Sequence, residues 1–155
     1  MAKRKKKSKI ELEKLSNDEI KELSCLLNEL DKREAEKDLL SFTKYFFKKN
    51  NQEFVVNKHH KDIASILKKV EQGKIKNLLI NIPPRYGKTE LAVINWIARC
   101  LAVNPKARFI HLSYSDDLAL DNSQKAKELI ESDEYKNFWD VRLKSDSKSK
   151  KKWYT

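Results

Sequence analysis

The feature that most constrains the fold of this 155-residue chain is a short apolar run that ends abruptly in a proline-rich turn. The run Asn-Leu-Leu-Ile-Asn-Ile at residues 77–82 predicts a buried strand. Two prolines and a glycine within residues 83–87 end this strand, because proline cannot donate a hydrogen bond to a β-ladder. Residues 88–103 then return to a helical pattern that is apolar on most sides, as in a helix that packs on a sheet.

Residues 108–114 predict a second strand, and residues 116–132 predict a further helix. Two strands joined through a helix of this length must run parallel, with a right-handed crossover. The predicted fold class is therefore α/β with parallel strands. A parallel sheet normally has more than two strands and is covered on both faces, so we expect an incomplete domain.

Helical patterns precede these strands. Ser16 and Glu19 have the spacing of a capping box, and a dense apolar group at residues 39–47 is expected to dock on the main core. Asn57 can cap the next helix, and Gly73 lies where that helix should end. The predicted organisation is a disordered basic tail at 1–15, an N-terminal helical segment at 16–50, a partial α/β domain at 51–143, and a basic tail or truncated end at 144–155.

The formal net charge is +11. A balance this basic favours a polyanionic partner, nucleic acid before membrane, because each neutralised phosphate releases a counterion. Much of the excess lies in lysine clusters at residues 3–9 and 144–152, which could equally be solvated tails. No apolar run approaches the roughly 20 residues of a membrane-spanning helix. The basic N-terminus is not followed by an apolar segment, so it does not have the form of a secretory signal. We therefore expect a cytoplasmic protein without a membrane partner.

The chemistry is concentrated in the segment Pro84-Arg85-Tyr86-Gly87-Lys88-Thr89-Glu90, which we predict to bind a nucleotide. Gly87, Lys88 and Thr89 match the end of the phosphate-loop pattern G-x-x-x-x-G-K-[ST], although Ile82 stands in place of its first glycine. Lys88 would contact the β- and γ-phosphates of ATP, and the Thr89 hydroxyl would bind Mg²⁺. Arg85 would add a cation beside the γ-phosphate. A Gly-Lys-Thr tripeptide alone could be an exposed turn, so the prediction depends on the strand before it and the helix after it.

Residues 83–90 also resemble the variant phosphate loop of phage large terminase subunits. The resemblance continues over about residues 38–143 and is carried outside the loop by His59, His60, Ile63 and Leu67, and by Ile110 to Ser115, Leu118, Ala119, Asn122 and Ser123. It implies a P-loop ATPase of the additional-strand type, followed in the whole family by a nuclease, in a motor that drives double-stranded DNA into the capsid. It further implies a homo-oligomeric ring, a portal protein and a small terminase subunit as partners, and the host cytoplasm as location. By this resemblance Arg85 and Lys88 are catalytic.

The chain departs from the family in one respect that bears on activity. No apolar strand ending in paired acids follows Ser115, so the acidic hydrolysis motif has no counterpart, and neither do the nuclease carboxylates. We expect an N-terminal fragment that binds ATP without turning it over; the alternative is a nucleic-acid-binding or motor-interfering remnant. His59 and His60 could lie near the adenine pocket, but we expect one exposed histidine and one packed against the sheet; Phe54 could stack on adenine or be a core or loop aromatic.

Overall fold

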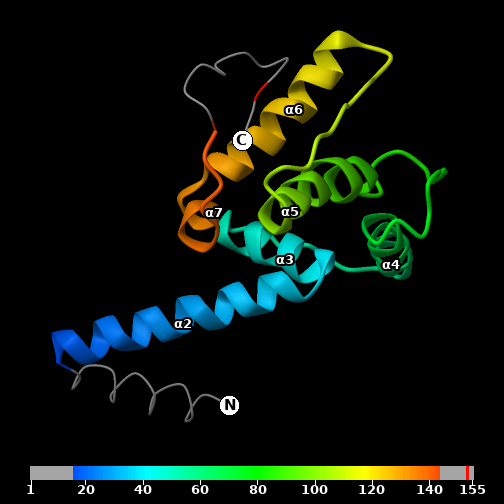
Figure 1. Ribbon diagram of the computed structural model, residues 1–155. Helices are drawn as coiled ribbons and strands as arrows, with labels where there is room; N and C mark the ends of the chain where they lie inside the picture. The colour runs from blue at the N-terminus through cyan, green and yellow to red at the C-terminus, as the bar shows by residue number, and fades with distance from the viewer. Residues whose placement is uncertain (1–15, 144–152, 154–155) are drawn as a thin grey trace. The chain divides into compact units, whose positions relative to one another are not determined.

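Helices make up all the regular secondary structure in the residues that the computed structural model describes, which are 16–143 and Trp153. They fall into two compact units, one reaching to Glu34 and the other beginning at Ala35. No helix in residues 16–143 combines the length and the apolar character needed to cross a bilayer. The elements (Figure 1) are α2 (Asn17–Lys37), α3 (Leu39–Lys49), α4 (Lys58–Glu71), η1 (Glu90–Asn95), α5 (Trp96–Val103), α6 (Asp116–Glu131) and α7 (Asp133–Phe138).

The capping box predicted at the start of α2 is present. The Ser16 amide donates to Glu19 Oε2 at 2.7 Å, and the Glu19 amide donates to Ser16 Oγ at 3.3 Å. These bonds to Ser16 lower the pKa of the Glu19 carboxyl below its ordinary value. The apolar stripe of α2 is exposed within its own unit; Leu23 and Leu30 retain 37% and 59% of their accessible surface.

Helix α4 begins and ends where the sequence predicts. Asn57 is its N-cap, and a capping box joins Asn57 to His60. At the other end Gly73 adopts a φ of +69°, and the amides of Gly73 and Lys74 donate to the carbonyls of Val70 and Lys69. This pair of bonds is a Schellman motif, in which glycine is favoured because the left-handed region costs it nothing.

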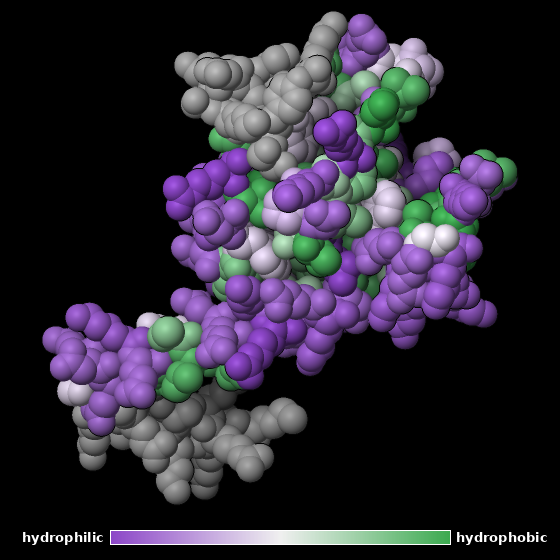
Figure 2. All heavy atoms as spheres, viewed as in Figure 1, coloured by the Kyte–Doolittle hydropathy of each residue, from purple (hydrophilic) through white to green (hydrophobic). Residues whose placement is uncertain are grey.

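The predicted α/β fold, an incomplete P-loop domain of the additional-strand type with parallel strands, is wrong. Within residues 16–143, the segments at 77–83 and 107–114 are neither helical nor paired as strands. Their apolar composition predicted burial, but a strand also needs a neighbour that completes its hydrogen-bond ladder. No such neighbour lies beside them in the described part of the chain, and Leu79, Ile110 and Leu112 are 92%, 89% and 84% exposed. Hydrophobic residues accordingly reach the molecular surface among hydrophilic ones (Figure 2).

The central element is the continuous helix formed by η1 and α5, which α3, α4 and α6 contact (Figure 1). The larger core cluster is rich in aromatic rings from α3 and α7, so the prediction that residues 39–47 dock on the core is confirmed. Tyr135 is fully buried, and its hydroxyl donates to the Ala98 carbonyl at 2.9 Å, which ties α7 to α5. The cluster contains Ala35, Phe42, Phe46, Ala98, Leu101, Ile130, Tyr135, Phe138, Trp139 and Val141.

A smaller cluster joins α3, α4 and η1 through Leu39, Ile63, Leu67 and Leu91. Ile80 and Ile82 pack against it, so the irregular segment between α4 and η1 is anchored by two of its apolar side chains. This anchoring brings the end of the segment to the first turn of the central helix, where residues 84–90 lie.

Candidate phosphate-binding loop

The loop predicted to bind phosphate leads directly into the central helix. The Leu91 amide donates to the Gly87 carbonyl at 2.9 Å, which is the first helical hydrogen bond. Helical structure then runs from Lys88 to Val103. The amides of a first helical turn have no partner within the helix, and the helix dipole favours negative charge there. The helix after the loop is therefore confirmed, whereas the predicted strand before it is absent.

Two residues of the loop have left-handed backbones. Arg85 has a φ of +67° and Gly87 a φ of +70°. The left-handed region strains a residue with a Cβ, so Arg85 holds a conformation that the rest of the loop must stabilise. Alternation of left-handed and right-handed residues turns successive amides toward one side of the chain, the arrangement that makes a concave anion site. The transition from Gly87 to the helical Lys88 has this form.

The polar side chains of the loop are accessible. Arg85, Lys88 and Thr89 are exposed, and neither Arg85 nor Lys88 forms an ion pair within residues 16–143. Thr89 precedes η1, and its hydroxyl makes no capping bond to that helix. Pro84 and Tyr86 are exposed as well, Tyr86 retaining 52% of its surface. Two cations and a hydroxyl are thus available to an anionic ligand.

Glu90 is the one predicted loop residue whose side chain is held by the protein. Its carboxylate accepts from Asn95 Nδ2 at 2.9 Å, and its carbonyl accepts from the same nitrogen at 2.8 Å. Burial raises the pKa of the Glu90 carboxyl, partly offset by the bond from Asn95. Asn95 is fully buried, and its two bonds to Glu90 span the single wide turn of η1, a π-helix. Such turns recur at functional sites.

A group of rings contacts the back of the loop. The ring of His60 in α4 lies 3.9 Å from that of His59 and 4.8 Å from that of Phe54, centroid to centroid. His59 in turn lies 5.5 Å from the ring of Tyr86. We expected one exposed histidine and one packed against a sheet, but the described residues form no sheet, and the histidine rings lie against each other and beside the rings of Phe54 and Tyr86. The missed signal is the spacing Asn57-x-x-His60, which puts a histidine in the glutamate position of a capping box.

Thr89 is the only residue of the prediction assigned to a metal. No group of three or more His, Cys, Asp or Glu side chains that could hold a metal ion occurs among the described residues. The exposed Thr89 hydroxyl, unused by the helix, fits a single protein ligand to an ion whose other ligands come from phosphate and water. The donor set therefore suits Mg²⁺ bound together with a nucleotide.

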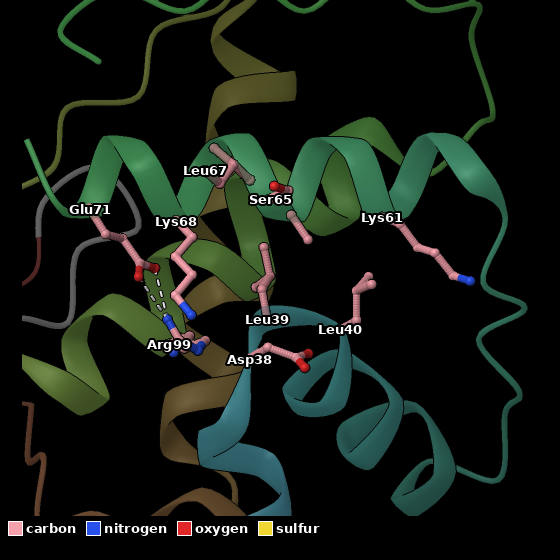
Figure 3. Close-up of a pocket in the computed structure, with 10 residues that line it drawn as sticks. Asp38, Leu39, Leu40, Lys61, Ser65, Leu67, Lys68, Glu71 and Arg99 are labelled. Carbon is pink, nitrogen blue, oxygen red and sulfur yellow. Dashed lines mark hydrogen bonds and ion pairs between the residues drawn. The ribbon is translucent and has the colours of Figure 1, made fainter. Parts of the chain in front are cut away.

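Two pockets of the described chain lie outside the loop. One, of about 270 Å³, is an open pocket lined by residues of α3 and α4, by Asp38 and by Arg99 of α5 (Figure 3). At one side of it Arg99 Nη1 donates to both carboxylate oxygens of Glu71, at 2.8 and 3.0 Å, while Lys61 extends away from the pair (Figure 3). Trp96 Nε1 also donates to Glu71, at 3.0 Å. The carboxylate is therefore occupied in joining α4 to α5.

The second pocket, of about 260 Å³, lies between α4 and residues 78–82 and includes His59.

Comparison of the chain with protein-family models, with curated proteins and with solved structures returned no match. The function is therefore inferred from the geometry of the loop and the chemistry of its side chains.

Proposed function

We propose that residues 84–90 bind the phosphate groups of a nucleoside triphosphate together with Mg²⁺. The observation that carries the proposal is the loop itself, in which a left-handed Gly87 leads into the unpaired amides at the start of a long helix. Lys88 and Arg85 supply accessible cations that no carboxylate of the described chain neutralises. Backbone donors, a helix dipole and point charges on one side of a loop are the usual means of holding phosphate.

Each residue has a distinct part in this proposal. The amides that follow Gly87 bind phosphate oxygens, and the Lys88 ammonium neutralises their charge. The Thr89 hydroxyl holds Mg²⁺, which when bound would neutralise charge on the same phosphates. Arg85 lies two residues before Gly87 and can contact the terminal phosphate. Glu90 is engaged with Asn95 and serves to hold the first turn in place.

The biological setting we propose is the ATP-binding part of a phage large terminase, the motor that packages double-stranded DNA. This rests on the resemblance of residues 83–90 and of their flanking segments to that family. Double-stranded DNA, the portal protein, the small terminase subunit and further copies in a ring are the proposed partners, in the cytoplasm of the host. The 155-residue polypeptide contains no acidic hydrolysis motif, so we propose nucleotide binding without turnover by this polypeptide alone.

Substitution Lys88→Met tests the phosphate site. We expect the affinity for a non-hydrolysable ATP analogue with Mg²⁺, measured by calorimetry, to fall by about ten- to a hundredfold, because a charge-assisted hydrogen bond contributes about 1.5–3 kcal/mol. Methionine keeps the aliphatic stem, so the change isolates the ammonium. Omitting Mg²⁺ should weaken binding to the unaltered chain as well.

The matched control is Lys69→Met, which removes an equal charge from an exposed position of α4. Non-specific attraction of a polyanion to a basic protein would weaken equally in both variants. Equal affinities in the unaltered chain and in Lys88→Met, or equal losses in the two variants, would remove the assignment of the phosphate site.

The charge of +11 favours a second property, binding to duplex DNA. The lysine clusters predicted to contribute, residues 3–9 and 144–152, lie outside the described residues. We expect the affinity for duplex DNA to fall steeply with salt; a protein that neutralises about six phosphates loses roughly 10³ in affinity between 50 and 200 mM. Fluorescence anisotropy against a salt series measures the slope, with Lys88→Met as a variant that should retain it. An affinity independent of salt would contradict the DNA proposal.

A further inference from the structure

The His60 ring joins the first turn of α4 to the phosphate loop. Its Nδ1 accepts a hydrogen bond from the Asn57 amide at 3.1 Å. A ring nitrogen that accepts carries no proton, so the neutral ring has its proton on Nε2. Nε2 lies 3.1 Å from the Tyr86 carbonyl and donates to it, across 26 residues of sequence. Both nitrogens are therefore used, one by the helix cap and one by the loop.

The bond reaches the loop at its most constrained point. Tyr86 lies between Arg85 and Gly87, the two residues with left-handed backbones. A Cβ added to Gly87 would lie 3.1 Å from His60 Nε2, so the ring fills the space that a side chain there would need. The loop backbone thus rests directly on the imidazole.

The surroundings of His60 hold it in this state. Its side chain is buried, with 6% of the residue exposed, between the rings of Phe54 and His59. Burial lowers the pKa of His60 below its ordinary value, opposed by the Tyr86 and Val55 carbonyls, with a further lowering from His59. The neutral, donating form is therefore the one present near neutral pH.

We propose that His60 is a positioning residue, which holds residues 84–89 in their phosphate-binding conformation through its hydrogen bond to the Tyr86 carbonyl. The inference rests on the proposed phosphate site and adds to it a residue from another helix. A helix cap alone would need only Nδ1 and would place no requirement on Nε2. The directed contact with the loop is what distinguishes positioning from capping.

The variants His60→Asn and His60→Gln separate the two roles. The asparagine oxygen lies near the place of Nδ1 and can accept from the Asn57 amide, but the side chain is too short to reach Tyr86. The glutamine amide reaches the place of Nε2 and can donate to the Tyr86 carbonyl, and glutamine is itself a capping-box residue. We expect affinity for the ATP analogue with Mg²⁺ to fall about tenfold in His60→Asn and to stay within about threefold of the unaltered chain in His60→Gln.

Thermal unfolding of both variants shows whether each is folded before binding is measured. Equal affinities for the two variants, whether both retained or both reduced, would overturn the positioning role. If the unaltered chain binds no analogue at all, the proposed phosphate site fails, and hydrogen exchange of the amides at residues 85–90 still tests His60. Faster exchange in His60→Asn than in His60→Gln would support the contact with the loop, and identical exchange would overturn it.

Discussion

Gly87→Ala is expected to abolish measurable binding of the ATP analogue while lowering the free energy of unfolding by about 1–2 kcal/mol. The φ of +70° is strained for alanine, and the new methyl would lie 3.1 Å from His60 Nε2. Either the ring or the loop must shift by a few tenths of an ångström. Because the amides of the anion site belong to this loop, a shift there moves the donors away from the phosphate oxygens. Calorimetry and chemical denaturation measure the two effects.

Gly73→Ala is a matched control for the backbone strain. Gly73 has a φ of +69°, nearly that of Gly87, but a Cβ there would meet nothing within 4 Å. We expect the same loss of stability, about 1–2 kcal/mol, with unchanged affinity for the analogue. Equal effects of the two substitutions on binding would show that general destabilisation, and not the fit of the loop against His60, limits the site.

Phe42→Ala is expected to produce the largest loss of stability, about 3–5 kcal/mol. The Phe42 ring is fully buried, with the rings of Phe46 and Trp139 at centroid distances of 4.7 and 5.5 Å. Its removal leaves a cavity between α3 and α7 that rigid aromatic neighbours cannot close. A loss of this size is a large share of the total stability of a domain. Chemical denaturation followed by circular dichroism measures it, and a loss below about 1 kcal/mol would contradict the described core.

Leu79→Ala serves as its control and also tests the irregular segment at residues 77–83. Leu79 is 92% exposed, so its truncation should change stability by no more than about 0.5 kcal/mol. In the buried strand predicted from the sequence the same substitution would cost about 2–5 kcal/mol. The result therefore separates the predicted strand from the observed coil.

Short sequence patterns predicted the helix ends well, because the interactions that start or end a helix join residues that are close in the sequence. The capping box at Ser16 and Glu19 and the Schellman motif at Gly73 depend on hydrogen bonds within a single turn. The loop at residues 84–90 was singled out for the same reason, because the action proposed for its glycine, lysine and threonine depends on their own backbone and side chains. In α4, Ile63 and Leu67 lie four residues apart, as on one face of a helix, and both are buried.

The sequence by itself thus determined where α2 starts and where α4 starts and stops, and it supplied the proposal that residues 84–90 bind phosphate. Only the tertiary structure decided that residues 77–82 and 108–114 are not strands, because a ladder requires a partner that lies elsewhere in space. It also decided that His60 contacts the loop, across 26 residues of sequence. Both outcomes depend on groups that are far apart in the sequence. The fold determines whether a hydrogen-bond donor of the backbone or of the His60 ring lies beside an acceptor.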